Sequence, residues 1–186
     1  MKKYLVGADE VGRGCLFGPV VAAAVILGNY KNFDLKDSKK LSEKKRVILL
    51  NDIKKNATKI SIGEASVNEI DFLNIKEASL LAMKRAILGL KFKNIEVIVD
   101  GIDIPKINYP CKAIIKADDK IPEVMAASIV AKVHRDNLMI ALSKKYPDFF
   151  LEKNKGYPTK EHLNILKSLG PTKYHRKSFK PVLDAR

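Results

Sequence analysis

A short apolar segment that ends in two adjacent acids most constrains what this chain can fold into. Residues 4–8 precede Asp9 and Glu10, a glycine-framed arginine occupies 12–14, and a second apolar run covers 20–27. Both runs are short, rich in β-branched or aromatic residues, and bounded by Gly or Pro, which is typical of strands. The connection between them is long for a hairpin and rich in glycine and charge. We therefore interpret it as a functional loop.

The rest of the sequence alternates between strand and helix patterns. Three strands close in sequence, followed by strands that helices separate, predict an α/β fold. We expect a central mixed sheet flanked by helices, with a helical C-terminal region. Further strands are predicted over 59–67, 95–101 and 113–115, and helices over 43 to about 54 (capped by Ser42), 68 to about 90 (capped by Asn68), 121–145 and 160–169 (capped by Thr159).

The length of 186 residues predicts a single domain over 1–186, in which about 146–186 form a helical C-terminal substrate-binding extension. No segment is long and apolar enough to cross a membrane, and the N-terminus has no signal-peptide pattern, so we expect a cytoplasmic protein. Cys15 and Cys111 fit no metal-ligand spacing, and we expect free thiols. A monomer is expected.

The charge balance is strongly basic. The chain has 35 Lys and Arg residues against 21 Asp and Glu residues, a formal net charge of +14. A domain this basic attracts polyanions, of which nucleic acid is the commonest. The alternative is a compositional bias toward Lys, Asn and Ile that spreads lysines over the whole surface. Charge alone leaves both readings open.

Carboxylates follow three of the predicted strands. They are Asp9 with Glu10, Asp100, and Asp118 with Asp119. Each has an ordinary reading, because an Asp-Gly pair often forms a turn and acids often precede a helix. Together they can meet at one edge of a sheet, where their mutual repulsion is relieved by a divalent cation with oxygen ligands. The set therefore favours a metal-dependent phosphodiester enzyme.

Three other groups of residues suit a nucleic-acid ligand. Gly12, Arg13 and Gly14 let backbone amides and a guanidinium approach a phosphate, although they could form a plain turn. Ser38, Lys39 and Lys40 fit contact with a phosphate backbone, although a lysine run is usually a solvated surface. Tyr157 could stack on a sugar or base, or be a half-buried aromatic. We expect none of the three histidines to bind a metal.

An ordered set of fragments resembles the type 2 ribonuclease H (ribonuclease HII) family along nearly the whole chain. The departures are Val11, Ala117 and Met125, where the family usually has Ala, Gly and Ala, and none removes a group that the chemistry needs. The fragments are 7–14 (GADEVGRG), 18–25 (GPVVAAAV), 37–42 (DSKKLS), 70–75 (IDFLNI), 99–101 (VDG), 116–118 (KAD), 126–133 (AASIVAKV), 135–136 (RD), 156–157 (GY) and 175–179 (HRKSF).

The resemblance implies a ribonuclease H-like fold and cleavage of the RNA strand of RNA–DNA hybrids. It also implies cleavage 5′ to single ribonucleotides in duplex DNA, as in ribonucleotide excision repair, with 3′-hydroxyl and 5′-phosphate products and Mg²⁺ or Mn²⁺ as cofactor. It assigns catalysis and metal binding to Asp9, Glu10, Asp100 and Asp118, recognition of the ribose 2′-hydroxyl to residues 12–14, and stacking on the adjacent deoxyribose to Tyr157.

Three alternatives stay open at this point. A type 3 ribonuclease H usually has an extra N-terminal domain, for which the early first strand leaves no room. The chain could also be another ribonuclease H-like nuclease or a non-catalytic nucleic-acid-binding module, for which the net charge of +14 would suffice. Residues 178–186 contain no glutamine-and-aromatic peptide of the kind that binds a sliding clamp, so that partner is not expected.

Overall fold

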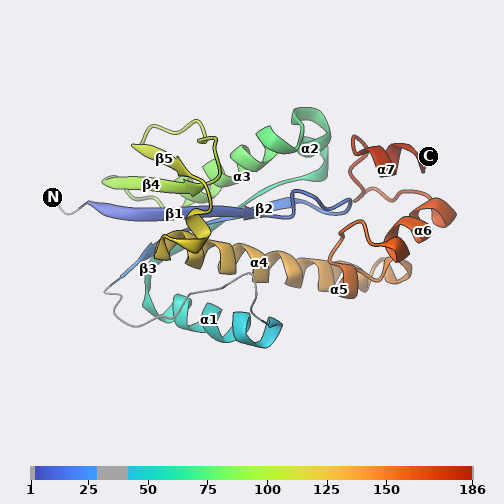
Figure 1. Cartoon of the computed structure of the whole chain (residues 1–186), viewed down its shortest axis with the longest axis horizontal. Coiled ribbons are helices and arrows are strands. Elements are labelled where there is room, and N and C mark those ends of the chain that lie inside the picture. The colour runs from blue at the N-terminus through green and yellow to red at the C-terminus, as the bar shows by residue number, and fades with distance from the viewer. Residues whose placement is uncertain (1–2, 29–41, 186) are drawn as a thin grey trace.

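A computed structural model of the chain describes residues 3–28 and 42–185 (Figure 1). The strands are β1 (Tyr4–Val11), β2 (Val20–Leu27), β3 (Ala57–Ala65), β4 (Ile95–Asp100) and β5 (Cys111–Ile114). The helices are α1 (Glu43–Asn56), α2 (Val67–Leu73), α3 (Ile75–Gly89), α4 (Pro122–Ser143), α5 (Leu151–Asn154), α6 (Lys160–Leu169) and α7 (Lys180–Leu183), with 3₁₀ turns η2 (Ala117–Asp119) and η3 (Pro147–Phe149).

The strands form one mixed sheet in the order β3-β2-β1-β4-β5. β2 pairs antiparallel with β1 and β3, whereas β4 pairs parallel with β1 and β5. After β3 at one edge of the sheet, α2 and α3 carry the chain back across it, so that β4 pairs parallel with β1. The expected mixed sheet flanked by helices, with a helical C-terminal region, is confirmed.

Alternating residues of the central strands build a core on each face of the sheet. Val6 and Ala8 of β1 pack with the buried face of α3, which includes Ala82 and Ala86 at the expected helical spacing. Ala23 of β2 packs on the other face with residues of α1 and α4. Figure 1 shows α3 and α4 on opposite sides of the strands. Successive side chains of a strand point to opposite faces of the sheet, so a single strand contributes residues to both core layers.

The long helix α4 lies unusually close to β1. A Cβ at Gly7 would overlap the backbone of Glu123 and Val124, so only glycine permits this approach. Beyond the sheet, α4 continues into the C-terminal region, where a third apolar cluster surrounds Phe17 and Met139. The helix thus joins the sheet to the C-terminal segments, and both border the site described below.

The structure corrects several predicted boundaries. β1 extends to Val11, so Asp9 and Glu10 lie within the strand and not beyond it. The single helix expected from Asn68 is wrong: Ser66 caps α2, and the chain breaks at Asn74 before α3. Strands β3 and β5 begin two residues before the predicted positions.

Ser38, Lys39 and Lys40 lie outside the described residues. Within the described residues, no helix has the length and apolar character needed to cross a membrane. Cys15 and Cys111 are free thiols.

Candidate active site

Parallel pairing of the two central strands brings Asp9 and Asp100 together. The register between β1 and β4 ends with Ala8 opposite Val99, so Asp9 and Asp100 follow as neighbours on adjacent strands. Because Ala8 and Val99 face α3, the side chains that follow them turn to the α4 face. Asp9 accordingly accepts a hydrogen bond from Ser128 of α4 and is only 5% exposed.

Asp9 is a carboxylate in an electrostatically costly position. Burial raises the pKa of Asp9 well above its ordinary value, and the charges of Glu10 and Asp100 raise it further. Hydrogen bonds from Ser128 and from the Glu10 amide, which donates to Asp9 Oδ1 at 2.8 Å, oppose the shift. A cation placed among these three acids would remove most of the penalty.

Glu10 makes a single ion pair with the neighbouring loop. Arg13 Nη1 donates to Glu10 Oε1 at 3.1 Å, whereas Glu10 Oε2 is buried and has no hydrogen-bond partner in the described part of the chain. Burial raises the pKa of Glu10, and the hydrogen bond and charge of Arg13 partly offset the shift. An unsatisfied carboxylate oxygen next to Asp9 is the kind of ligand atom that a hard cation binds.

Asp100 is fixed by the segment that carries Asp118. The Ala117 amide donates to Asp100 Oδ1 at 2.7 Å, and Asp118 follows Ala117 in η2. Asp118 itself is 2% exposed and does not line the pocket that the other three acids share. The structure therefore brings Asp9, Glu10 and Asp100 together and places Asp118 one residue from the contact that holds Asp100.

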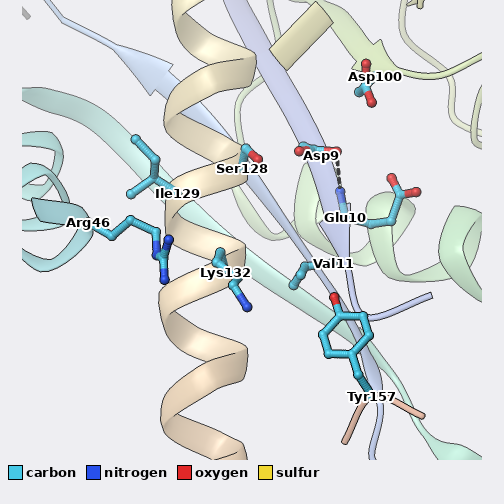
Figure 2. Close-up of a pocket in the computed structure, with 9 residues that line it drawn as sticks. All are labelled: Asp9, Glu10, Val11, Arg46, Asp100, Ser128, Ile129, Lys132 and Tyr157. Atoms are coloured by element: carbon cyan, nitrogen blue, oxygen red, sulfur yellow. Dashed lines mark hydrogen bonds between the residues drawn. The ribbon is translucent and has the colours of Figure 1, made fainter. Parts of the chain in front are cut away.

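These three acids open into a pocket of about 290 Å³, shown in Figure 2. Cationic side chains from α1 and α4, Arg46 and Lys132, line the same pocket. Sequence reasoning did not single out Arg46, Ser128 or Lys132, although Ser128 and Lys132 stand four residues apart on one helix face. The full lining is Asp9, Glu10, Val11, Arg46, Asp100, Ser128, Ile129, Lys132 and Tyr157.

Two buried arginines shape the loop between β1 and β2. Arg135 of α4 donates to the carbonyls of Phe17 at 2.9 Å and Pro19 at 3.2 Å, and to that of Lys155 at 2.8 Å. Arg176 donates to the carbonyls of Gly18 at 3.0 Å and Arg13 at 2.9 Å. Such charge-assisted bonds fix the loop, and with it residues 12–14, against the C-terminal segments.

Tyr157 reaches the acids from the C-terminal region. Its side chain is 36% exposed, and its hydroxyl points toward β1 in Figure 2. Lys132 Nζ lies 5.9 Å from the centre of the ring, and the thiol of Cys15 is hydrogen-bonded to the hydroxyl. The structure thus unites Tyr157 with three predicted acids, although more than fifty residues separate it from Asp100.

Comparison with known sequences gives the family. The sequence model of ribonuclease HII matches residues 6–182. Ribonuclease HII of Pelagibacter ubique is 53% identical over 98% of this chain and 98% of its own length, and that of Hydrogenovibrio crunogenus is 51% identical over 97% of this chain and 87% of its own. The chain belongs to the ribonuclease HII family. It is a divalent-metal-dependent endoribonuclease for RNA–DNA hybrids.

Solved structures of related proteins have the same fold. Ribonuclease H2 of Pyrococcus horikoshii superposes with a TM-score of 0.81 at 26% identity, covering 97% of this chain and 96% of that one. Ribonuclease HII of Archaeoglobus fulgidus, solved in complex with PCNA, gives 0.79 at 31% identity and 95% coverage of both. Bst-RNase HIII in complex with Mn²⁺ shares the fold, with a TM-score of 0.77, 17% identity, and coverage of 98% of this chain and 69% of that one.

The carboxylates of the pocket suit a hard divalent cation in their chemistry. Carboxylate oxygens are the ligands that Mg²⁺ and Mn²⁺ prefer, and a buried oxygen of Glu10 lacks a partner within the described residues. Across residues 3–28 and 42–185, no three His, Cys, Asp or Glu side chains are grouped closely enough to enclose an ion as they stand. Asp9, Glu10 and Asp100 nevertheless line one pocket.

Proposed function

We propose that this pocket hydrolyses the phosphodiester bond 5′ to a ribonucleotide, in RNA–DNA hybrids and in DNA duplexes that contain single ribonucleotides, leaving 3′-hydroxyl and 5′-phosphate ends. The observation that carries the proposal is the convergence of Asp9, Glu10 and Asp100 in the pocket that Tyr157 also lines. Three acids from adjacent strands suit phosphodiester chemistry, and a tyrosine at their edge suits a nucleotide sugar.

In this proposal Asp9, Glu10, Asp100 and Asp118 hold Mg²⁺ or Mn²⁺. When bound, the metal supplies an activated water and stabilises the leaving oxygen. Burial and mutual repulsion, which raise the pKa of Asp9, favour cation uptake by the same group. The role of Asp118 rests on the family resemblance and on its position next to the Ala117 amide that holds Asp100.

The cationic and loop residues position the substrate. Lys132 and Arg46 face the same pocket and suit the phosphate that is cleaved. The backbone of residues 12–14, held by Arg135 and Arg176, reads the ribose 2′-hydroxyl, the group that distinguishes RNA from DNA locally. Tyr157 stacks on the deoxyribose that follows. A site that hydrogen-bonds a hydroxyl strongly rejects a substrate that lacks it.

The expected domain organisation, oligomeric state, location and phosphate contacts also stay proposals. We propose one catalytic domain over 1–186, with about 146–186 as the substrate-binding extension, acting as a monomer in the cytoplasm. We propose that Ser38, Lys39 and Lys40 contact the phosphate backbone. A sliding clamp is not proposed as a partner, since residues 178–186 contain no glutamine-and-aromatic peptide, although the relative from Archaeoglobus fulgidus was solved with PCNA.

The experiment is cleavage of an end-labelled DNA duplex that contains one ribonucleotide, with Mg²⁺, with Mn²⁺ and with EDTA, beside an all-DNA control. We expect one metal-dependent cut, 5′ to the ribonucleotide. Tight binding without a cut under either metal would favour a binding module. A cut in the all-DNA control would retain the metal site and remove the role of the 2′-hydroxyl.

A further inference from the structure

A second hollow begins at the far side of Asp100 from the active-site pocket. It measures about 450 Å³ and lies between the start of α3, the turn after β4 and the turn before η2. We call it the α3 groove. Residues Arg13, Lys76, Asp103 and Lys116 line it together with Asp100. Because Asp100 also lines the active-site pocket, the two hollows adjoin at one catalytic carboxylate.

The three cations of the groove differ in their partners. Arg13 is paired with Glu10 at 3.1 Å, and Lys76 Nζ is paired with Asp103 Oδ1 at 2.8 Å. The side chain of Lys116 is exposed and has no ion pair or hydrogen bond to any described residue. The Lys76–Asp103 pair is also solvent-exposed, and such pairs are weak enough for a phosphate to compete. Lys116 is thus the cation most available to a ligand.

The backbone of Lys116 adopts a conformation that lysine rarely takes. Its φ of 56° and ψ of 44° are left-handed, which is unfavourable for a residue with a Cβ. The next residue explains why it persists, because the Ala117 amide is bonded to Asp100 Oδ1 and the Asp119 amide to the Lys116 carbonyl at 3.2 Å. The lysine therefore projects from a turn that is tied directly to a catalytic carboxylate. Strained residues held in this way cluster at functional sites.

We propose that the α3 groove binds the phosphodiester backbone of the cleaved strand on the 5′ side of the ribonucleotide, with Lys116 as its principal phosphate contact and Lys76 as a second. The proposal rests on the proposed function. Tyr157, assigned there to the sugar on the 3′ side, lines the active-site pocket and not the groove. If the cleaved nucleic-acid strand runs from Tyr157 past Asp9 and Asp100, its continuation on the 5′ side enters the α3 groove.

The rim of the groove also suits a nucleotide chain. Ile102 and Ile115 are 77% and 62% exposed, and both line the groove. Apolar side chains beside lysines accommodate the apolar faces of sugars and bases while the ammonium groups neutralise phosphates. Isolated exposed isoleucines would need no explanation, but these two flank a hollow that shares Asp100 with the active-site pocket.

The first test measures the salt dependence of duplex binding in EDTA, so that no cleavage is needed. Each phosphate contact contributes about 0.9 to the slope of log Kd against log salt. We expect Lys116→Gln and Lys76→Gln each to lower the slope by about one and weaken binding severalfold, whereas Lys116→Arg keeps the wild-type slope. Lys112→Gln is the matched control. It removes the same charge, but Lys112 lies on β5 beside Glu96 and outside the groove.

The second test locates the contact on the strand. Shortening the cleaved strand on the 5′ side of the ribonucleotide should weaken wild-type binding severalfold and weaken Lys116→Gln clearly less, because only the Lys76 contact remains to be lost, while shortening the 3′ side weakens both equally. Asp103→Asn, which releases Lys76, should tighten binding. If Lys116→Gln responds to 5′ shortening as the wild type does, or if Lys112→Gln lowers the slope as much, the groove is not the strand's path. Failure of wild-type cleavage would overturn the proposed function separately.

Discussion

Gly12 and Gly14 flank the same arginine but have different surroundings. Gly12 has a φ of +91°, and a Cβ there would overlap the guanidinium of Arg135. Gly14 has no heavy atom within 4 Å of the position that a Cβ would take, and its φ is not positive. Packing therefore requires the first glycine. The second glycine has open space beside it, which the proposed function assigns to the ribose of the substrate.

The two glycines give a matched pair of variants. Gly12→Ala should lower the free energy of unfolding by about 1–3 kcal/mol, because the backbone conformation becomes strained and Arg135 must move. Gly14→Ala should change it by less than about 0.5 kcal/mol and still lower kcat/KM for a single-ribonucleotide duplex by tenfold or more, because a methyl group stands where the ribose approaches. Urea denaturation and steady-state kinetics measure both. Equal losses of stability would contradict the assignment.

At the scale of elements, the break between α2 and α3 depends on a single residue. Asn74 has a φ of 75°, and its side chain accepts a hydrogen bond from the Glu77 amide at 3.1 Å, so it ends one helix and caps the next. The break fixes the start of α3 and therefore the position of Lys76, which lines the α3 groove. Asparagine combines tolerance of positive φ with capping ability.

We expect Asn74→Ala to destabilise the protein by about 1–2 kcal/mol, since it loses the cap and must keep the left-handed backbone. Asn74→Gly should cost only a few tenths of a kcal/mol, because glycine accepts that conformation and caps acceptably. Thermal unfolding of both variants decides the matter. A larger loss for glycine than for alanine would show that the backbone conformation is not the constraint.

The same break shows where sequence reasoning failed. Ile75, Ala78, Ala82 and Ala86 recur at helical spacing, and this pattern correctly predicts α3. Periodicity does not register a one-residue interruption, so the capping box of Ser66 with Glu69 was overlooked in favour of Asn68. Local signals that are strong and contiguous, such as Ser42 before α1 and Thr159 before α6, were predicted correctly.

The site shows the same division. Asp9, Glu10 and Asp100 were predictable because they lie on or beside strands whose pairing brings them together. Arg46, Ser128 and Lys132 were not, because each looks like an ordinary residue of an amphipathic helix until α1 and α4 are placed over the sheet. The assignment of Asp118 over Asp119 came from the resemblance. In the structure Asp118 is buried and Asp119 exposed, and the choice of Asp118 as the metal ligand stays a prediction.

At the scale of the whole molecule, two buried histidines join the distant segments around Tyr157. His162 Nδ1 lies 2.9 Å from the Tyr157 carbonyl, which makes it a donor, and His162 Nε2 then accepts from His175 Nε2 at 3.2 Å. The Thr172 amide donates to His175 Nδ1 at 3.0 Å. Every ring nitrogen is thus used with both rings neutral. Burial and the nearby His162 lower the pKa of His175 to about 3.

This pair predicts acid sensitivity. Burial also lowers the pKa of His162, so both histidines take up protons in the unfolded chain, near pH 6.5, before they do so in the folded protein. Stability is therefore full above about pH 6.5 and falls as pH decreases toward 3, by about 1.4 kcal/mol per pH unit for each proton.

The measurement is the unfolding free energy between pH 7 and 5 for the wild type and His175→Gln. Glutamine can accept from Thr172 and donate to His162 without titrating, so the variant should lose less stability on acidification. His134→Gln is the control, since His134 of α4 is only half-buried and is paired with Glu64 of β3. A variant profile parallel to that of the wild type would contradict a neutral, buried pair.

The most direct test of the account is the kinetics of Asp100→Asn on a duplex with one ribonucleotide. Asparagine keeps the oxygen that accepts from Ala117, so the fold should match the wild type, and duplex binding in EDTA should be no weaker. We predict a fall in metal-dependent kcat of more than about 100-fold, since even residues that only support metal ligands cost 10- to 100-fold. Full Mg²⁺-dependent cleavage by Asp100→Asn would contradict the assignment of this pocket as the catalytic site.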